Sequence, residues 1–318
     1  MQPGMGIPGW FRFRWKVLYG CDRLNAVPKF AVMNKRSKRW SALAVYGARV
    51  CLAIGLWLMP SLVSAQSTNK AVYFTADFES ADWFKAWGAR QLPENCELVS
   101  ADETRKFEPL AGKALRVKVN KDGHYGTSVE YRFKRQTGSE PEEVFFRYYL
   151  RLGDDWTATQ GGKFPGVGGT YGKAGWGGRP VNGTDGWSAR GQFEGRKDGK
   201  TPVGYYCYHM DMKGKYGSQW IWDKDKLGYL ENNRWYCIEQ QVKLNTPGKA
   251  DGVMRGWVDG KLAFEKTDVR MRSVDALKVE MVWLNIYLGG TWTAKADHHV
   301  YIDEVVISRE PIGVRKRE

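Results

Sequence analysis

Five residues in three neighbouring segments of the chain are of the types that could carry out acid–base chemistry on a negatively charged substrate. The segments are "GGKFPGVGG", "GWSARGQF" and "YYCYHM", and the residues are Lys163, Ser188, Arg190, Tyr206 and Tyr208. Because side chains alternate along a strand, Ser188 and Arg190 share one face, and Tyr206 and Tyr208 share another. We expect the two faces to adjoin on neighbouring strands, with Lys163 on a glycine-rich loop that leads into them.

This set of groups suits β-elimination on a polymer of uronic acids. The proton next to a uronate carboxylate is a very weak acid, and cations beside the carboxylate stabilise the charge that develops when it leaves. We expect Lys163 and Arg190 to neutralise the carboxylate, with Arg190 binding it in bidentate fashion. Tyr206 or Tyr208, with a pKa lowered by the cations, would act as base and then as acid, and Ser188 would orient the sugar or the tyrosine.

Two other functions compete with this interpretation. A non-catalytic carbohydrate-binding β-sandwich would need the aromatic residues and cations but not the tyrosine pair. Within the lyase interpretation, Tyr205 could replace one of the two tyrosines of that pair. A glycoside hydrolase would need two carboxyl groups that flank the scissile bond. The strand-like candidates for that role are Glu194, Asp211, Glu239 and Glu280, and they form no recognisable motif.

Aromatic and polar residues elsewhere could line a sugar-binding cleft, since the chain has 15 tryptophans and 16 tyrosines. We expect substrate contacts from His124, Gln192, Trp176, Asn285 and Tyr287. No cofactor or catalytic metal is required by this chemistry. A structural calcium ion held by oxygen ligands of Asp77, Glu79 and Asp303, near the first and last strands, is an alternative that we do not favour, because these ligands are few.

The first 65 residues resemble an export signal rather than folded structure. A basic stretch (33–40) precedes an apolar segment that ends in Val63-Ser64-Ala65, a small-residue cleavage pattern. Met33 is an alternative start to Met1. We therefore expect a leader at 1–65, a single domain at 66–318, a secreted or periplasmic location, and no stable membrane span after cleavage.

Removal of this leader changes what the charge implies. Residues 1–65 contain ten of the 49 basic residues and one of the 35 acidic ones, so the remainder has a net charge of +5 instead of +14. A mildly basic exported domain favours an acidic polysaccharide over nucleic acid as partner, and we expect a monomer. Among its three cysteines we favour a disulfide between Cys207 and Cys237, with Cys96 left over.

From residue 71 onwards the pattern predicts an all-β fold. Short runs rich in aromatic and β-branched residues alternate with glycine, proline, asparagine and aspartate, and "VDGK" (258–261) is typical of a tight hairpin. Only "ESADWFKAW" (79–87) could form a short helix. We expect two antiparallel sheets in a jelly-roll sandwich.

The order of these motifs resembles polysaccharide lyase family 14, which includes alginate and glucuronan lyases with a jelly-roll fold. The resemblance rests on "GGKFPGVGG", "GWSARGQF", the Tyr-x-Tyr strand, "LNTPGKADG", "NIYLGG" and "YIDEVVIS", within residues 140–308. It implies a lyase without a catalytic metal, with Lys163, Ser188, Arg190, Tyr206 and Tyr208 on the family's active-site positions. The sequence departs from the family at Phe164, where leucine is frequent, and in the long glycine-rich segment 170–186.

Overall fold

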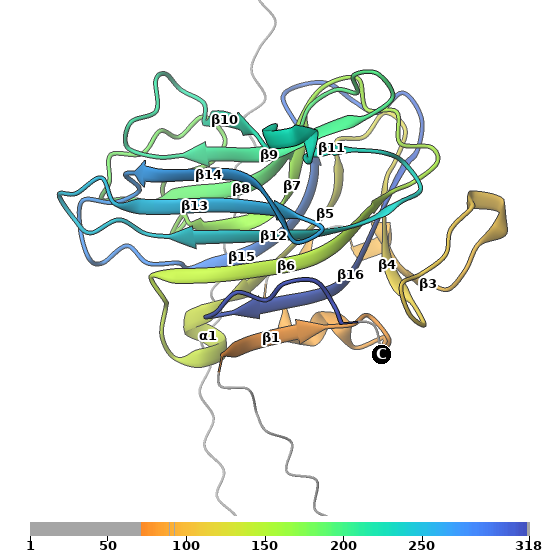
Figure 1. The fold of residues 1–318 in the computed structure, drawn as a ribbon, viewed down its shortest axis with the longest axis horizontal. Coiled ribbons are helices and arrows are strands. Elements are labelled where there is room, and N and C mark those ends of the chain that lie inside the picture. The colour runs from red at the N-terminus through yellow and green to blue at the C-terminus, as the bar shows by residue number, and fades with distance from the viewer. Residues whose placement is uncertain (1–70, 89, 92, 317–318) are drawn as a thin grey trace, which may run out of the picture. The chain divides into compact units, whose positions relative to one another are not determined.

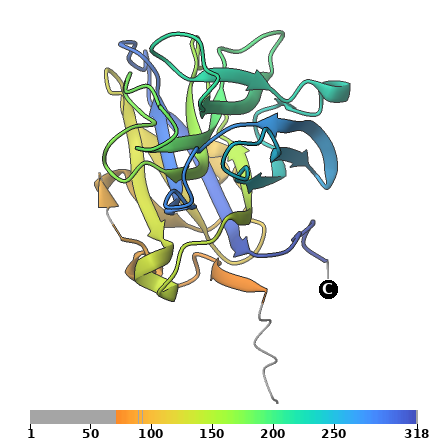
Figure 2. The ribbon, with the colours of Figure 1, turned by 90° about the vertical axis from the view of Figure 1, so that its left-hand side faces the viewer.

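The computed structural model describes residues 71–88, 90–91 and 93–316, which form two antiparallel β-sheets packed face to face (Figures 1 and 2). The expected leader at 1–65 lies outside the described residues. The all-β, two-sheet sandwich predicted from the sequence is confirmed. No helix among the described residues is long and apolar enough to cross a membrane.

The first sheet, which we call the β6 sheet, has the strand order β14-β13-β12-β6-β16-β4-β3, with β1 paired to β16. Its strands are β1 (Val72–Ala76), β3 (Cys96–Val99), β4 (Ala114–Val119), β6 (Glu143–Leu152), β12 (Trp235–Lys243), β13 (Gly252–Val258), β14 (Lys261–Val269) and β16 (His298–Ser308). β1 pairs with β16, so the first and last strands lie together.

The second sheet, which we call the β8 sheet, has the order β10-β9-β8-β7-β15-β5-β2, with β11 paired to β9. Its strands are β2 (Arg90–Gln91), β5 (Tyr125–Arg132), β7 (Gly162–Gly169), β8 (Trp187–Phe193), β9 (Thr201–Tyr208), β10 (Ser218–Ile221), β11 (Tyr229–Leu230) and β15 (Met281–Leu288). Figure 1 shows β12 and β13 of the β6 sheet in front of β7 and β8.

Helical structure in the described residues is short. One α-helix, α1 (Phe133–Thr137), follows β5, and four 3-10 turns are η1 (Trp83–Ala86), η2 (Pro93–Asn95), η3 (Glu103–Arg105) and η4 (Lys224–Lys226). The short helix expected near Trp83 is therefore a single turn. The "VDGK" hairpin is confirmed, because Asp259 and Gly260 join β13 to β14 with φ values of 50° and 76°, as a tight two-residue turn requires.

The hydrophobic core fills the space between the sheets, and strand alternation decides which residues enter it. On β15, for example, Val282, Leu284 and Ile286 belong to the core. The residues between them, such as Trp283 and Asn285, therefore point to the opposite face of the β8 sheet. That outer face carries the candidate site.

The predicted disulfide between Cys207 and Cys237 is wrong. Neither Cys207 nor Cys237 forms a disulfide bond. Cys207 lies on β9 and packs in the core, with its sulfur 3.9 Å from the sulfurs of Met254 and Met271. Cys237 lies on β12 of the other sheet, opposite Tyr149. The two thiols therefore belong to different sheets, and only that of Cys207 joins the core cluster.

Candidate active site

Lys163 lies in a strand, not in the loop that we expected. It belongs to β7, a central strand between β8 and β15. Glycine is needed there because the neighbouring backbone comes very close: a Cβ on Gly166 would lie 2.5 Å from Cα of Arg190. Pro165 sits where the register of β7 and β8 shifts, as proline in a sheet usually does. Because the glycines of β7 carry no side chains, the strand leaves room above it for the long side chains of its neighbours.

The strand register brings the predicted catalytic residues together. Arg190 on β8 lies opposite Tyr206 on β9, and Ser188 lies opposite Tyr208. β7 pairs with the side of β8 away from β9, and there Lys163 lies opposite Gln192. The Lys163 Nζ is 3.5 Å from the centroid of the Tyr206 ring, and the Arg190 Cζ is 5.7 Å from it.

Arg190 is a buried cation without a counter-ion. Its residue exposure is 7 %, and its guanidinium makes no hydrogen bond or ion pair with any described residue. Its contacts are with aromatic rings, including that of Trp283 at 4.9 Å from Cζ. A buried charge is costly unless it is paired, so this guanidinium is arranged to receive a negatively charged group from outside the chain.

Lys163 experiences the same environment. Its side chain is 9 % exposed, and its ammonium reaches only the carbonyl of Gly162, at 3.4 Å. Burial, together with the nearby charge of Arg190, lowers its pKa from 10.5 to about 7. A substantial fraction of the side chain is therefore a neutral amine at neutral pH.

The two tyrosine hydroxyls are held by backbone groups of two loops. The Tyr206 hydroxyl accepts a hydrogen bond from the N–H of Gly217 at 3.2 Å, and that of Tyr208 accepts one from Gly178 at 3.0 Å. The expectation that the cations lower the tyrosine pKa is wrong for Tyr206. Burial and the neighbouring Tyr208 raise its pKa by more than the charge of Arg190 lowers it.

The ambiguity over Tyr205 is resolved by its position. Its ring packs in the core, and its hydroxyl donates a hydrogen bond to the carbonyl of Arg255. Tyr206 and Tyr208 are therefore the pair on the outer face, as the alternation pattern predicted.

Ser188 holds a loop rather than facing open space. Its hydroxyl is fully buried and donates a 2.6 Å hydrogen bond to the carbonyl of Gly175, in the glycine-rich segment 170–186. The same segment carries the N–H of Gly178 that contacts Tyr208. In this arrangement Ser188 fixes the segment that positions a candidate catalytic tyrosine.

A cleft of about 410 Å³ opens on this face beside Arg190. Three of the five predicted substrate-contacting residues line it: Trp176, Asn285 and Tyr287. His124 does not line the cleft, and its ring lies 6.4 Å from that of Tyr287. Gln192 is 2 % exposed and does not line the cleft, although it lies on the same face of β8.

Sequence reasoning missed two aromatic residues of this cleft. Trp283 lies under the guanidinium of Arg190, and Tyr125 stacks on Tyr287 with ring centroids 4.6 Å apart. The alternation that pairs Asn285 with Tyr287 also places Trp283 on their face, so this signal was present in the sequence. Tyr125 is brought to Tyr287 by the pairing of β5 with β15, which sequence pattern alone does not specify.

The residues weighed for calcium do not gather around one point. No group of three or more histidine, cysteine, aspartate or glutamate residues suited to a metal ion occurs in the described part of the chain. Carboxylate oxygens of Asp77 and Glu79 accept hydrogen bonds from backbone N–H groups. Asp303 is 1 % exposed, and burial raises its pKa to about 8. Calcium binding stays an untested and unfavoured prediction.

The carboxylates considered for a hydrolase each have a separate partner. Glu194 pairs with Lys197, Asp211 with Arg270, and Glu280 with Arg132, while Glu239 accepts N–H groups of the C-terminal segment on the β6 sheet. Of these four, only Glu280 is adjacent to the cleft, and its two oxygens are already engaged by Arg132 and the N–H of Tyr171. These four residues provide no flanking carboxylate pair, and Glu130, which does line the cleft, is paired with Arg132.

The chain has relatives among known proteins. Residues 111–305 match the model of the family polysaccharide lyase 14, and this match spans more than half of the chain. The chain therefore belongs to polysaccharide lyase family 14 and is a polysaccharide lyase. No curated protein sequence matches it significantly.

Solved structures of low sequence identity share the fold. Alginate lyase Aly36B matches with a TM-score of 0.56 and 20 % identity, covering 76 % of this chain and 98 % of the other. The marine alginate lyase of Aplysia kurodai gives 0.58 and 18 %, covering 74 % and 98 %. The endo-β-1,4-glucuronan lyase of the fungus Trichoderma reesei gives 0.52 and 17 %, covering 75 % and 96 %.

Proposed function

We propose that this lyase cleaves a uronate-containing polysaccharide of the alginate or glucuronan type by β-elimination. The observation that carries the proposal is the buried guanidinium of Arg190, which no described residue neutralises. A uronate carboxylate is the planar anion that a guanidinium binds best, and every residue of such a polymer offers one. The names of the structural neighbours supply the two candidate polymers.

In the proposed reaction, Arg190 binds the carboxylate and stabilises the negative charge that develops on it. A base removes the proton from the carbon next to the carboxylate. The bond from the adjacent carbon to the glycosidic oxygen then breaks, and an acid protonates the departing oxygen. The new chain end carries a carbon–carbon double bond conjugated with the carboxylate.

The site suggests a division of roles that differs from the sequence-based expectation. Tyr206 stays a phenol at neutral pH, because its pKa is raised, and is therefore suited to donate the proton to the leaving oxygen. Lys163, with a pKa of about 7, is suited to act as the base. In the alternative assignment Lys163 only neutralises charge, and Tyr206 or Tyr208 removes the proton.

We also propose that the chain is exported to a secreted or periplasmic location and acts as a monomer. The leader pattern at 1–65 supports export. Amino-terminal sequencing of the exported protein is expected to begin at Gln66. A protein that retains residues 33–65 after export would contradict cleavage.

The proposed reaction is tested with a panel of polymers: glucuronan, polymannuronate, polyguluronate and a neutral glucan. We expect ultraviolet absorbance of the unsaturated uronate to rise with one or more polyuronates and not with the glucan. New reducing ends without that absorbance would indicate hydrolysis. Retention of the polymer with neither signal would indicate a binding module.

A further inference from the structure

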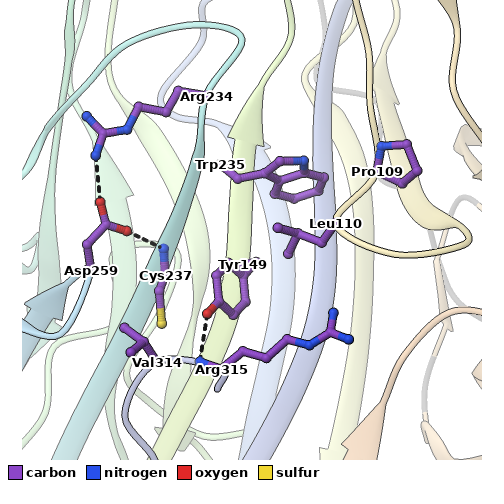
Figure 3. A pocket seen from close by; sticks show the side chains of 9 residues that line it. All are labelled: Pro109, Leu110, Tyr149, Arg234, Trp235, Cys237, Asp259, Val314 and Arg315. Atoms are coloured by element: carbon purple, nitrogen blue, oxygen red, sulfur yellow. Dashed lines mark hydrogen bonds and ion pairs between the residues drawn. The ribbon is translucent and has the colours of Figure 1, made fainter. Parts of the chain in front are cut away.

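A second and larger cleft lies on the β6 sheet, on the face turned away from the core. Its volume is about 810 Å³, roughly twice that of the cleft beside Arg190. Its floor includes Tyr149 of β6 and Cys237 of β12, which are opposite each other in the sheet. Figure 3 shows Trp235 and the 109–110 loop on one side, and Arg234 and Asp259 on the other.

This cleft continues into a neighbouring cavity of about 340 Å³ that shares Arg234 and Asp259 with it. We call the two together the outer groove. Its charged and aromatic lining residues are Tyr149, Lys200, Asp225, Lys226, Tyr229, Glu231, Arg234, Trp235, Tyr236, Asp259, Lys261 and Arg315.

The charge of the outer groove favours an anion. Five cations and three carboxylates line it. Two of the cations are paired within the groove, Lys200 with Glu231 and Arg234 with Asp259, each at 2.8 Å. A third, Arg315, pairs with Glu304 outside the groove at 3.2 Å. The ammonium groups of Lys226 and Lys261 form no ion pair with any described residue and are exposed. A groove with surplus positive charge raises the local concentration of a polyanion.

Four aromatic residues line the groove, and three of them, Tyr149, Tyr229 and Trp235, are half-buried and open to a ligand. The fourth, Tyr236, is 4 % exposed and belongs to the core. The indole N–H of Trp235 donates a 2.8 Å hydrogen bond to the carbonyl of Glu108, which fixes the ring at the rim. Arg234 lies over the ring of Tyr236 at 4.5 Å, and Lys226 over that of Tyr229 at 4.8 Å. Flat rings with polar edges suit the apolar faces and the hydroxyl groups of pyranose sugars.

The outer groove is separate from the catalytic site. The floor of its larger cavity belongs to the β6 sheet, whereas Lys163 and Arg190 lie on the outer face of the β8 sheet, and the core lies between them. Its smaller cavity includes Tyr229 of β11 and shares no lining residue with the cleft beside Arg190. A ligand in the groove therefore cannot be cleaved there, but it can hold the enzyme on a long polymer.

We propose that the outer groove is a second, non-catalytic binding site for an acidic, uronate-rich polysaccharide. The identity of the polymer rests on the proposed function. The presence of a polyanion site rests on the charges and rings of the groove itself. Because the lysines are exposed, the binding weakens as salt concentration rises.

The test uses electrophoresis of the full chain through native gels that contain a polyuronate, with neutral glucan gels as reference. All variants carry Lys163→Ala, so that the polymer stays intact. The double variant Lys226→Glu/Lys261→Glu reverses charge in the groove. The matched control Lys243→Glu/Lys249→Glu makes the same charge change at the opposite end of the β12–β13 hairpin, at positions that are also exposed.

We expect about tenfold weaker retention of the groove variant than of the control, and equal thermal unfolding temperatures. Equal retention of the two variants, or no retention of the parent chain, would overturn the proposal. Cleavage of short uronate oligomers is measured separately with the same substitutions on an intact Lys163, and we expect equal rates. If the groove variant is retained more weakly than the control, but the chain with an intact Lys163 forms no unsaturated product, the groove proposal is supported and the proposed reaction is refuted.

Discussion

Replacing Lys163 by arginine separates the two roles that this side chain could have. Arginine keeps the positive charge but remains protonated at any accessible pH, so it cannot remove a proton. If Lys163 is the base, Lys163→Arg loses nearly all activity. If Lys163 only neutralises the substrate carboxylate, the arginine variant keeps much of it.

The size of the effect follows from the environment of the amine. Burial and the charge of Arg190 lower the pKa of Lys163 from 10.5 to about 7. At pH 7 about half of the amine is then neutral, against roughly 0.03 % for an ordinary lysine, a gain in the neutral form equivalent to about 4 kcal/mol. Loss of a general base typically slows a reaction about 100- to 10,000-fold, and we expect kcat of Lys163→Arg to fall by this amount.

The assay is the initial rate of unsaturated uronate formation between pH 5 and 9. For the wild type, kcat/KM is expected to rise as pH increases through about 7, because the neutral amine is the active form. Lys163→Met is the matched control without charge, and thermal unfolding checks that both variants fold. An arginine variant within tenfold of the wild type, or a wild-type rate that does not rise through pH 7, would refute the assignment of Lys163 as base.

Three further predictions concern single side chains. Tyr206→Phe keeps the ring that contacts Lys163 but removes the hydroxyl, so kcat is expected to fall at least about 100-fold with little change in unfolding temperature; normal kcat would exclude Tyr206 as the acid. Arg190→Met is expected to abolish cleavage without lowering the unfolding temperature, because it removes a buried charge that has no partner, and a marked drop would mean that Arg190 is structural. In the folded protein Asp303 has a pKa of about 8, above its value in the unfolded chain, because burial favours the neutral carboxyl group. The contribution of Asp303 to the free energy of unfolding is therefore complete below about pH 4 and is lost as the pH rises to about 8. Asp303→Asn is therefore expected to be more stable than the wild type at pH 8, by up to a few kcal/mol, and equal to it near pH 4; calcium that stabilises only the wild type would instead indicate a metal site.

Alternation within strands made part of the site predictable from sequence. Once "WSARGQF" and "YYCYHM" are strands, the period of two places Ser188 and Arg190 on one face and Tyr206 and Tyr208 on another, and the observed register joins these faces. The same rule separates Tyr205, which enters the core. These inferences need only local geometry, and the structure confirms them.

Features that depend on contacts distant in sequence were not predictable in this way. The segment containing Lys163 resembles a loop because glycine and proline dominate it, but pairing with β15, more than 100 residues later, makes it a central strand. Cys207 and Cys237 both lie in strand-like segments, yet their strands belong to different sheets. The pKa of Tyr206 depends on how deeply the ring is buried, which residue types do not reveal.

The central claim is that a uronate carboxylate binds the unpaired guanidinium of Arg190 and that the chain is then cut by β-elimination. The most direct measurement compares one polyuronate with the same polymer after chemical reduction of its carboxyl groups to primary alcohols. We predict that ultraviolet absorbance of the unsaturated product rises with the polyuronate, and that the reduced polymer gives neither absorbance nor new reducing ends. Cleavage of the reduced polymer at a comparable rate would contradict the account, because neither Arg190 nor Lys163 would then have a carboxylate to recognise.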